Sequence, residues 1–468
     1  MSFIYHTRNS LRGKSLSKLT TSTSNFLTSN IYNHSISITN NNTNLNNTFS
    51  TFIHRSSIPS VSSSSSKSIR TFSTSSSAAD VTDPRLGLTP EQNEYYDIAL
   101  EFANNEMLPH AAKWDEEKIL PVDVLRKAAT LGFGAMYVNP EYGGTGLSRA
   151  EGVAVIEALA GACTSTTAYI TIHNMCAWMI DSFGTVQQKN TYLPKMASME
   201  LLSSYCLTEP NAGSDAASLQ TKATKDGDYY VLNGSKAFIS GGGNSDLYIV
   251  MARTGTPESG AAGISTFIVP NGTPGLSFGK QEKKLGWNSQ PTAAVFFENC
   301  RIPVTNRIGD EGSGFRYAMM GLDGGRLSIA ACSLGAANTC FNLARDYVQV
   351  RKQFNKPLIN NQTIEFKLAN MATDLVLARS SVRTAATLLD NKEPLARAYC
   401  ALAKKVATEK GFTICNDALQ LHGGYGYLKD YPIERYVRDT RVHTILEGTN
   451  QIMDVILARS LIHSGSKK

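Results

Sequence analysis

The chain has 468 residues, which is long enough for two or three domains. Its formal charge of +6 comes from one end: residues 1–79 hold seven of the 45 basic residues and no acid, which leaves 38 basic residues against 39 acidic ones in the remainder. A nearly neutral remainder lacks the usual electrostatic signal of a nucleic-acid-binding protein. No apolar run reaches the length of about 18 residues that a membrane-spanning helix needs, so neither nucleic acid nor a membrane is expected as a partner.

The first 79 residues are predicted to be a targeting segment outside the fold. They are dominated by Ser, Thr and Asn, and they lack the continuous apolar stretch of a secretory signal. Such a segment cannot bury enough apolar surface to fold, and its basic, acid-free composition is typical of a mitochondrial transit peptide. We therefore expect import into the mitochondrial matrix, with a plain Asn- and Ser-rich disordered tail as the alternative.

Residues 85–205 are predicted to be helical. A Thr-Pro start at residues 89–90 precedes apolar residues at helical spacing, including Tyr96 and Ala99. Residues 147–184 then stay apolar for so long that they must be largely buried.

The hydrophobic period changes to two over residues 206–310 and predicts a β-domain. Short runs rich in β-branched and aromatic residues, such as 229–240 and 264–271, alternate with turn residues. Within the first of these runs, Asn233-Gly234 predicts a hairpin turn, because both residues tolerate positive φ.

Helical patterns return over residues 311–468. Helical, β and helical zones in succession differ from the alternating pattern of a doubly wound fold, and no Rossmann or Walker fingerprint is present. The predicted fold class is therefore mainly α with a central β-domain.

The eight cysteines are scattered without CxxC spacing, so we interpret them as buried thiols in a reducing compartment. His422 and His443 have no partner at metal-ligand spacing. No metal site is predicted.

Two stretches and one isolated acid could carry chemistry. The loop at residues 205–215, YCLTEPNAGSD, suits a polar ring edge or a phosphate, and a plain connecting loop is the alternative. Gly423 and Gly424 are predicted to end a helix in left-handed conformations and to let a ligand approach closely, unless they only cap the helix. Glu447, in VHTILEGTNQI, is either a functional carboxylate or an acid that favours the dipole of the next helix.

Together these stretches resemble the acyl-CoA dehydrogenase family. CLTEPNAGSDAAS, at residues 206–218, is similar to its first signature, and QLHGGYGYLKDYPIERYVRD, at residues 420–439, is similar to its second. The resemblance extends from about residue 85 to the end of the chain. It implies an N-terminal α-helical domain, a middle β-barrel-like domain and a C-terminal four-helix bundle, and it implies FAD as cofactor and a homotetramer.

The resemblance also implies which residues bind FAD. Residues expected at the flavin are Tyr205, Cys206, Leu207, Thr208, Gly213, Ser214, Phe238, Ile239 and Ser240, although many relatives have Trp in place of Phe238. Residues expected at the FAD of a neighbouring subunit are Arg351, Phe354, Asn361 and Gln362. Residues expected at the adenosine diphosphate part are Gln420, Leu421, His422, Gly423, Gly424, Thr449, Asn450 and Gln451, the last three at a helix start that favours anions.

In this family the residue matching Glu447 is the catalytic base, which removes the proton α to the thioester carbonyl while a hydride leaves the β carbon for the flavin. The residues expected at the acyl-CoA substrate are Ser214, Asp323, Gly324, Gly325, Arg326 and Gly448, with Arg326 towards the nucleotide end. Some relatives carry their base at the position of Gly325. Because glycine cannot take a proton, Glu447 is expected to be the base here.

Within the family, the chain is most similar to members that convert isobutyryl-CoA to methacrylyl-CoA in valine breakdown and pass electrons to electron-transferring flavoprotein. Alternative substrates are 2-methylbutyryl-CoA and short straight-chain esters, since one methylene changes binding by only about 1 to 3 kcal/mol. An acyl-CoA oxidase is a different class, disfavoured by the transit-like segment and the missing Ser-Lys-Leu end. A non-catalytic helical assembly protein is a third class, disfavoured by the presence of Glu447 with both signatures.

Overall fold

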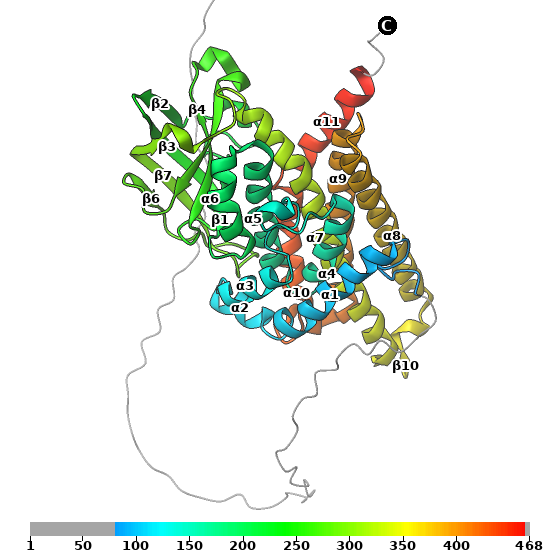
Figure 1. Ribbon diagram of the computed structural model, residues 1–468. Helices are drawn as coiled ribbons and strands as arrows, with labels where there is room; N and C mark the ends of the chain where they lie inside the picture. Colours follow the sequence, from blue (N-terminus) through cyan, green and yellow to red (C-terminus); the bar gives the residue numbers. More distant parts are fainter. Residues whose placement is uncertain (1–79, 464–468) are drawn as a thin grey trace, which may run out of the picture. The chain divides into compact units, whose positions relative to one another are not determined.

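A computed structural model of the chain describes residues 80–463 (Figure 1). The predicted transit segment, residues 1–79, lies outside the described residues, as do residues 464–468. The described residues form helical, β and helical zones in the predicted order, which confirms the fold class.

The first zone consists of helices. They are α1 (Pro90–Phe102), the π-turn η1 (Ala103–Met107), α2 (Ala111–Glu117), α3 (Val122–Thr130), η2 (Pro140–Tyr142), α4 (Arg149–Ala162), α5 (Thr164–Phe183) and α6 (Val186–Ala197). Helix α1 begins at the Thr-Pro signal: the Thr89 side chain accepts from the amide of Gln92, and the Gln92 side chain accepts from the amide of Thr89. The long apolar stretch divides at Cys163 into α4 and α5, and both helices are largely buried, as predicted.

The β zone among the described residues is one eight-stranded sheet. Its strands are β1 (Ser203–Cys206), β2 (Lys222–Asp226), β3 (Tyr229–Ser240), β4 (Leu247–Arg253), β5 (Ile264–Pro270), β6 (Leu276–Phe278), β7 (Thr292–Pro303) and β8 (Arg307–Ile308), and short helices η3 (Ala216–Ser218), η4 (Pro257–Gly263) and η5 (Val304–Asn306) lie between them. The order is β6-β7-β3-β2-β4-β5-β8, and β1 pairs with β4 in parallel.

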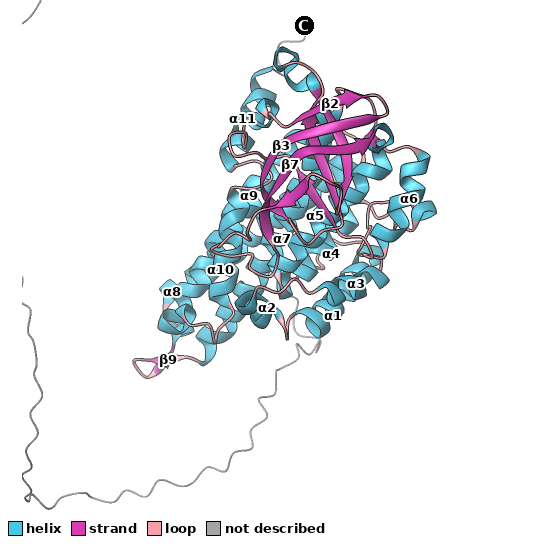
Figure 2. Ribbon diagram, turned by 90° about the vertical axis from the view of Figure 1, so that its left-hand side faces the viewer, coloured by secondary structure: helices cyan, strands magenta, loops and turns pink. Residues whose placement is uncertain are grey.

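Figure 2 shows the strands of this sheet in magenta beside the helices. Apolar side chains pack on both faces of the sheet. Because side chains alternate along a strand, Ile249 of β4 packs with Met179 of α5 on one face. Its neighbour Tyr248 packs with Phe267 in a separate cluster on the other face. The first cluster holds the sheet against α5 and the start of the long helix α7 (Gly314–Val350), where Tyr317 belongs to it.

The prediction of a hairpin turn at Asn233-Gly234 is wrong. Strand β3 runs through both residues, and its register against β7 shifts between Leu232 and Gly234, which is a β-bulge. The Asn233 side chain accepts from the amide of Asn299, and a Cβ on Gly234 would lie 2.6 Å from Thr221 Oγ1. Residues that tolerate positive φ suit a bulge as well as a hairpin, so the dipeptide alone does not separate the two. The turn itself lies between β2 and β3, at Gly227 with φ +57°.

Helices also build the last zone. They are α7, η6 (Leu358–Asn360), α8 (Gln362–Asp390), α9 (Ala396–His422), η7 (Gly423–Tyr427), α10 (Ile433–Arg441), η8 (Val442–Thr444) and α11 (Asn450–His463), with a small hairpin of β9 (Lys352–Gln353) and β10 (Lys356–Pro357) after α7. Helix α7 packs closely on α4, because a Cβ on Gly335 would lie only 2.2 Å from the carbonyl oxygen of Glu157. In the described part of the chain, α7 alone is long and apolar enough to cross a membrane, but 78% of its most apolar window is buried in the protein. It is the core helix of this zone.

All eight cysteines fall within the described residues, and each is unpaired and buried, as predicted. Between residues 80 and 463 there is no group of three or more His, Cys, Asp or Glu side chains that could hold a metal ion.

Candidate active site

Glu447 stands on a turn between η8 and α11. Glu447 and Gly448 have φ values of +56° and +88°, so two left-handed residues follow each other. Holding a non-glycine residue in this region costs about 1 to 3 kcal/mol, and such strain persists only where the surroundings impose it. The turn directs the Glu447 side chain at helix α7.

The Glu447 carboxyl group lies against α7 at Gly325. A Cβ on Gly325 would be 2.4 Å from Glu447 Oε2, so the space beside the carboxyl exists because residue 325 has no side chain. Oε2 is buried and has no hydrogen-bond partner among residues 80–463. Burial raises the pKa of Glu447 to about 7, although the cations of Arg326 and Lys404 lower it. A carboxyl group with this pKa can accept a proton from a carbon acid near neutral pH.

Gly325→Ala is expected to slow the chemistry without unfolding the protein. The atom that the new methyl group would meet is the end of a flexible side chain, so the Glu447 carboxyl would move and the helix would not. A displacement of about 1 Å can cost about 100-fold in rate, so we expect flavin reduction by the acyl-CoA to fall about 10- to 100-fold. Stopped-flow absorbance would measure the rate, and thermal unfolding would check stability.

Gly321→Ala is the matched control for this prediction. It adds the same methyl group one turn earlier on α7, where the nearest atom would be Met179 Sδ at an ordinary 3.4 Å. Equal rates for the two variants would show that the space at Gly325 does not serve the base.

Arg326 and Asp323, expected at the substrate, lie beside the base and are buried. Arg326 Nη1 donates to Asp323 Oδ1 at 2.5 Å, and Arg326 Nε donates to the carbonyl oxygen of Glu447 at 3.4 Å. Arg326 is only 2% exposed. A Cβ on Gly324 would instead meet the guanidinium of Arg149. The contact of Arg326 with the nucleotide end of the substrate stays a prediction.

Sequence reasoning missed Lys404. This side chain, on α9, is fully buried, and its Nζ donates to the carbonyl oxygen of Gly448 at 2.8 Å. Cys400 and Thr408, one turn away on either side, are also buried. Lysine is rarely fully buried without a partner, so a lysine on the apolar stripe of a helix is the signal that could have found it.

The structure brings the two predicted flavin segments together. The amide of Ala237 donates to the carbonyl oxygen of Thr208, which joins the 205–214 loop to the bulged end of β3. Lys236 is buried there, and its Nζ donates to Glu209 Oε1 at 2.8 Å, so it holds the same loop from the protein interior. Phe238 has φ +58° and is 70% exposed, so its ring projects from this surface, whereas Ile239 is buried.

Tyr205, at the start of the predicted flavin segment, lies near Glu447. Burial raises the pKa of the Tyr205 hydroxyl well above its usual value, and the charge of Glu447 adds to the effect. Within the loop, Cys206 and Leu207 are buried. Gly213 and Ser214 are exposed, and a Cβ on Gly213 would meet no described atom within 4 Å. The segment therefore begins near Glu447 at Tyr205 and is open to solvent at Gly213 and Ser214.

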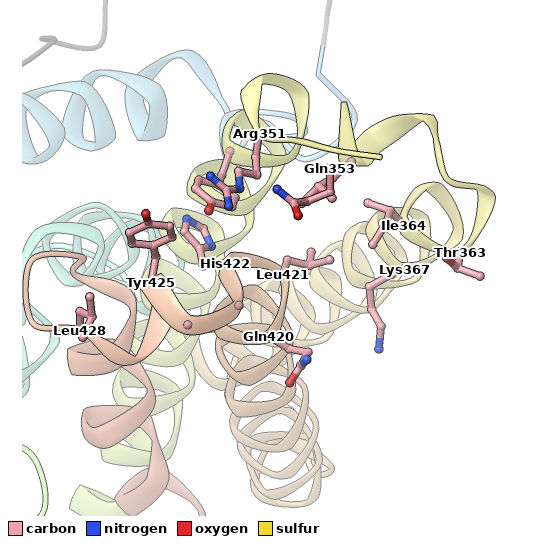
Figure 3. A pocket seen from close by; sticks show the side chains of 14 residues that line it. Arg351, Gln353, Thr363, Ile364, Lys367, Gln420, Leu421, His422, Tyr425 and Leu428 are labelled. Carbon is pink, nitrogen blue, oxygen red and sulfur yellow. The ribbon is translucent and has the colours of Figure 1, made fainter. Parts of the chain in front are cut away.

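A second group of predicted cofactor residues lies elsewhere, around a hollow of about 670 Å³ (Figure 3). Its lining includes Arg351 at the end of α7, the 420–424 segment at the end of α9, and the start of α8. Figure 3 shows Arg351 across from His422 and Tyr425, and the Arg351 guanidinium carbon lies 5.6 Å from the Tyr425 ring centre. Gly423 has φ +58° and ψ −139°, so it has the positive φ that suits glycine but not the predicted left-handed helical conformation, and Gly424 has no positive φ.

This hollow and the turn that carries Glu447 contact different parts of α9. Lys404 touches the turn and His422 lines the hollow, and the helix between them is about 27 Å long at 1.5 Å per residue. Phe354, at the tip of the β9-β10 hairpin, is 95% exposed, and Gln362 is exposed at the start of α8. Asn361 precedes α8 and bonds back to Leu358. A single chain therefore does not bring the two groups of predicted FAD residues together.

At the start of α11, Thr449 and Gln451 are accessible, whereas Asn450 is buried. The Asn450 side chain bonds to Lys404, Thr408 and Glu409 of α9. The hydrogen bonds of the Asn450 side chain are therefore all made within the protein. Only the backbone amide of Asn450 is available to bind an anion at the helix start.

The fold combines helical, β and helical zones with a buried carboxyl oxygen, and the raised pKa of that carboxyl group allows it to accept a proton near neutral pH. Three family models match successive parts of the chain: "Acyl-CoA dehydrogenase, N-terminal domain" at residues 89–200, "Acyl-CoA dehydrogenase, middle domain" at 204–300 and "Acyl-CoA dehydrogenase, C-terminal domain" at 312–462. The chain belongs to the acyl-CoA dehydrogenase family, whose members are FAD-dependent oxidoreductases, as the resemblance implied.

Among known proteins, the chain is 58% identical over 380 residues to the isobutyryl-CoA dehydrogenase, mitochondrial, of Bos taurus, covering 81% of this chain and 91% of that protein. It is also 58% identical over 381 residues to the protein of the same name from Dictyostelium discoideum, with the same coverage. The solved structure of butyryl-CoA dehydrogenase from Megasphaera elsdenii is similar with a TM-score of 0.78 at 36% identity, covering 80% of this chain and 99% of that one.

Proposed function

We propose that this protein oxidises isobutyryl-CoA to methacrylyl-CoA. The observation that carries the proposal is the Glu447 carboxyl group, which lies beside Gly325 and near Tyr205 and has no hydrogen-bond partner at Oε2 among the described residues. The substrate is supported by the 58% identity to two proteins named isobutyryl-CoA dehydrogenase.

In the proposed reaction, Glu447 takes the proton from the α carbon as a hydride leaves the β carbon, and the electron pair of the α C–H bond becomes the new C=C bond. Bound FAD supplies the hydride acceptor. Glu447 ends the step as a neutral acid. Because burial raises the pKa of Glu447 to about 7, the carboxylate is basic enough to take the proton and the acid form is accessible afterwards. The buried cation of Arg326, at the carbonyl oxygen of Glu447, helps to hold the turn in place.

The two groups of FAD residues fit a cofactor shared between two chains. The 670 Å³ hollow has a cation at Arg351, and Cβ atoms on Gly423 and Gly424 would meet no described atom within 4 Å, which leaves room for a diphosphate against the backbone. This group lies about 27 Å along α9 from the catalytic turn. We therefore propose that residues 420–424, with Arg351, Phe354, Asn361 and Gln362, hold the adenosine diphosphate part of a FAD whose flavin lies in a neighbouring subunit.

We further propose that the protein is a homotetramer in the mitochondrial matrix and that it passes its electrons to electron-transferring flavoprotein. The acid-free, Ser-rich composition of residues 1–79 supports import, and two relatives are named mitochondrial. The exposed Phe354 supports a contact with another subunit.

Anaerobic bleaching of the purified protein's flavin absorbance tests the proposed function. Isobutyryl-CoA, 2-methylbutyryl-CoA, butyryl-CoA and isovaleryl-CoA are compared in parallel, and isobutyryl-CoA is expected to reduce the flavin fastest. Faster reduction by another ester would keep the chemistry and change the substrate. Rapid reoxidation by oxygen without an electron carrier would indicate an oxidase, and a colourless protein unable to take up FAD would overturn the proposal.

A further inference from the structure

A fully buried lysine contacts the turn that carries the base. Lys404 Nζ donates to the carbonyl oxygen of Gly448 at 2.8 Å and to Asn450 Oδ1 at 2.8 Å. It therefore binds both the residue directly after Glu447 and the first residue of α11. The family signatures do not include Lys404 and assign it no role in the reaction.

The second partner of Lys404 is itself fixed in orientation. Asn450 is 4% exposed, and its Nδ2 donates to Thr408 Oγ1 at 3.2 Å and to Glu409 Oε1 at 3.1 Å. The Glu409 carboxylate can only accept and the Lys404 ammonium can only donate, so Asn450 Nδ2 faces Glu409 and Asn450 Oδ1 faces Lys404. The start of α11 is thus held to one turn of α9, and the left-handed Glu447-Gly448 pair lies between this attachment and η8.

Lys404 is also one of two cations that face the base. The charges acting on Glu447 are those of Arg326 from α7 and Lys404 from α9. Tyr205 and Cys176 are close enough to interact electrostatically with Glu447. Both are neutral near pH 7, because burial raises their pKa values. Arg326 is partly compensated by Asp323, to which it is bonded.

The groups that face Lys404 leave it charged near neutral pH. Burial lowers the pKa of Lys404 to about 8, Glu447 and Glu409 oppose that effect, and Arg326 adds to it. His443 is near too, but burial lowers its pKa to about 3, so it is neutral. Its Nε2 accepts from Trp287 Nε1, which requires the same neutral form.

We propose that Lys404 is a positioning residue for Glu447: it fixes the left-handed turn through Gly448 and Asn450, and its cation near the carboxyl group favours the ionised form of the base. This inference rests on the proposed function. It assigns to α9 a part in catalysis that is separate from its FAD-binding end.

The pH dependence of flavin reduction tests the inference. Without the cation, the pKa of Glu447 rises above about 7, so in Lys404→Met the acid limb of the rate profile is expected to move to higher pH. The expected shift is at least about one pH unit, because a unit charge within about 12 Å has that effect at an effective dielectric constant of about 20. The rate at pH 7 is expected to fall about 10- to 100-fold, because the turn also loses its anchor. Loss of structure alone would lower the rate without moving the limb.

Two further variants separate the hydrogen bond from the charge. Lys404→Gln keeps a donor towards Gly448 and removes the cation, so it is expected to retain the shifted limb with a smaller loss of rate at high pH. Lys404→Arg keeps the cation, so its limb is expected at the wild-type position. If Lys404→Met does not fold, these two variants decide the question.

Lys405→Met is the matched control. It removes a lysine from the next position of α9, where the side chain is 31% exposed and pairs with Asp454, away from the turn. Its profile is expected to match that of the wild type. One outcome would overturn the role of Lys404 and leave the proposed function intact. In that outcome the wild type and Lys405→Met are bleached, and the acid limb of Lys404→Met and Lys404→Gln stays at the wild-type position. Absence of bleaching in the wild type with any ester would overturn the proposed function and this inference with it.

Discussion

Glu447→Gln is expected to lower the rate of flavin reduction by isobutyryl-CoA at least about 100-fold, the low end for loss of a positioned base. Gln has nearly the same volume, so it fills the space beside Gly325 but cannot take the α proton. FAD and the CoA ester are expected to bind as in the wild type, because neither the 670 Å³ hollow nor the 205–214 loop is altered. Single-turnover stopped-flow absorbance gives the rate, and ester-induced changes in the flavin spectrum give binding.

A relocated base provides the control for this result. A side chain at residue 325 starts 2.4 Å from the place that Glu447 Oε2 occupies, so a carboxylate from there can reach the same space. Glu447→Gly combined with Gly325→Glu is therefore expected to recover part of the activity that Glu447→Gly alone loses. Near wild-type reduction by Glu447→Gln would mean that another group is the base.

Glu157→Ala is expected to lower the free energy of unfolding by about 3 to 5 kcal/mol, the usual result of leaving one member of a buried ion pair alone. Glu157 of α4 and Arg379 of α8 are each 4% exposed, and Arg379 Nε donates to Glu157 Oε1 at 2.8 Å. Arg379 also donates to Thr82 O and to Asn338 Oδ1, so its charge cannot leave the interior without breaking several contacts. Urea unfolding at fixed protein and FAD concentrations, followed by near-ultraviolet circular dichroism, would measure the change.

The matched control removes an ion pair of the same helix at the surface. Asp374 of α8 pairs with Lys410 of α9 at 3.1 Å, with side chains 29% and 47% exposed. Asp374→Ala is expected to cost no more than about 1 kcal/mol, because exposed pairs are screened by water. Equal losses in the two variants would contradict the view that burial of Arg379 makes its pair important.

The sequence by itself determined the zones and several of their boundaries. Periods of 3.6 and 2 are local properties of a chain, so they predict the helical, β and helical zones without knowledge of packing. The start of α1 at Thr89-Pro90 depends on side-chain and backbone groups three residues apart, and for that reason it was predicted correctly. The family signatures likewise identified an acyl-CoA dehydrogenase, and Glu447 as its expected base, since both rest on contiguous residues.

Only the tertiary structure decided what depends on residues far apart in the chain. Asn233-Gly234 forms a bulge because β7 continues alongside β3, a pairing that the dipeptide does not encode. The pKa of Glu447 is raised because the turn buries its carboxyl group against Gly325, more than a hundred residues away, and the cations of Lys404 and Arg326 offset part of this rise. Burial and charge pairing set the energies of these groups, and both arise only when distant segments pack together.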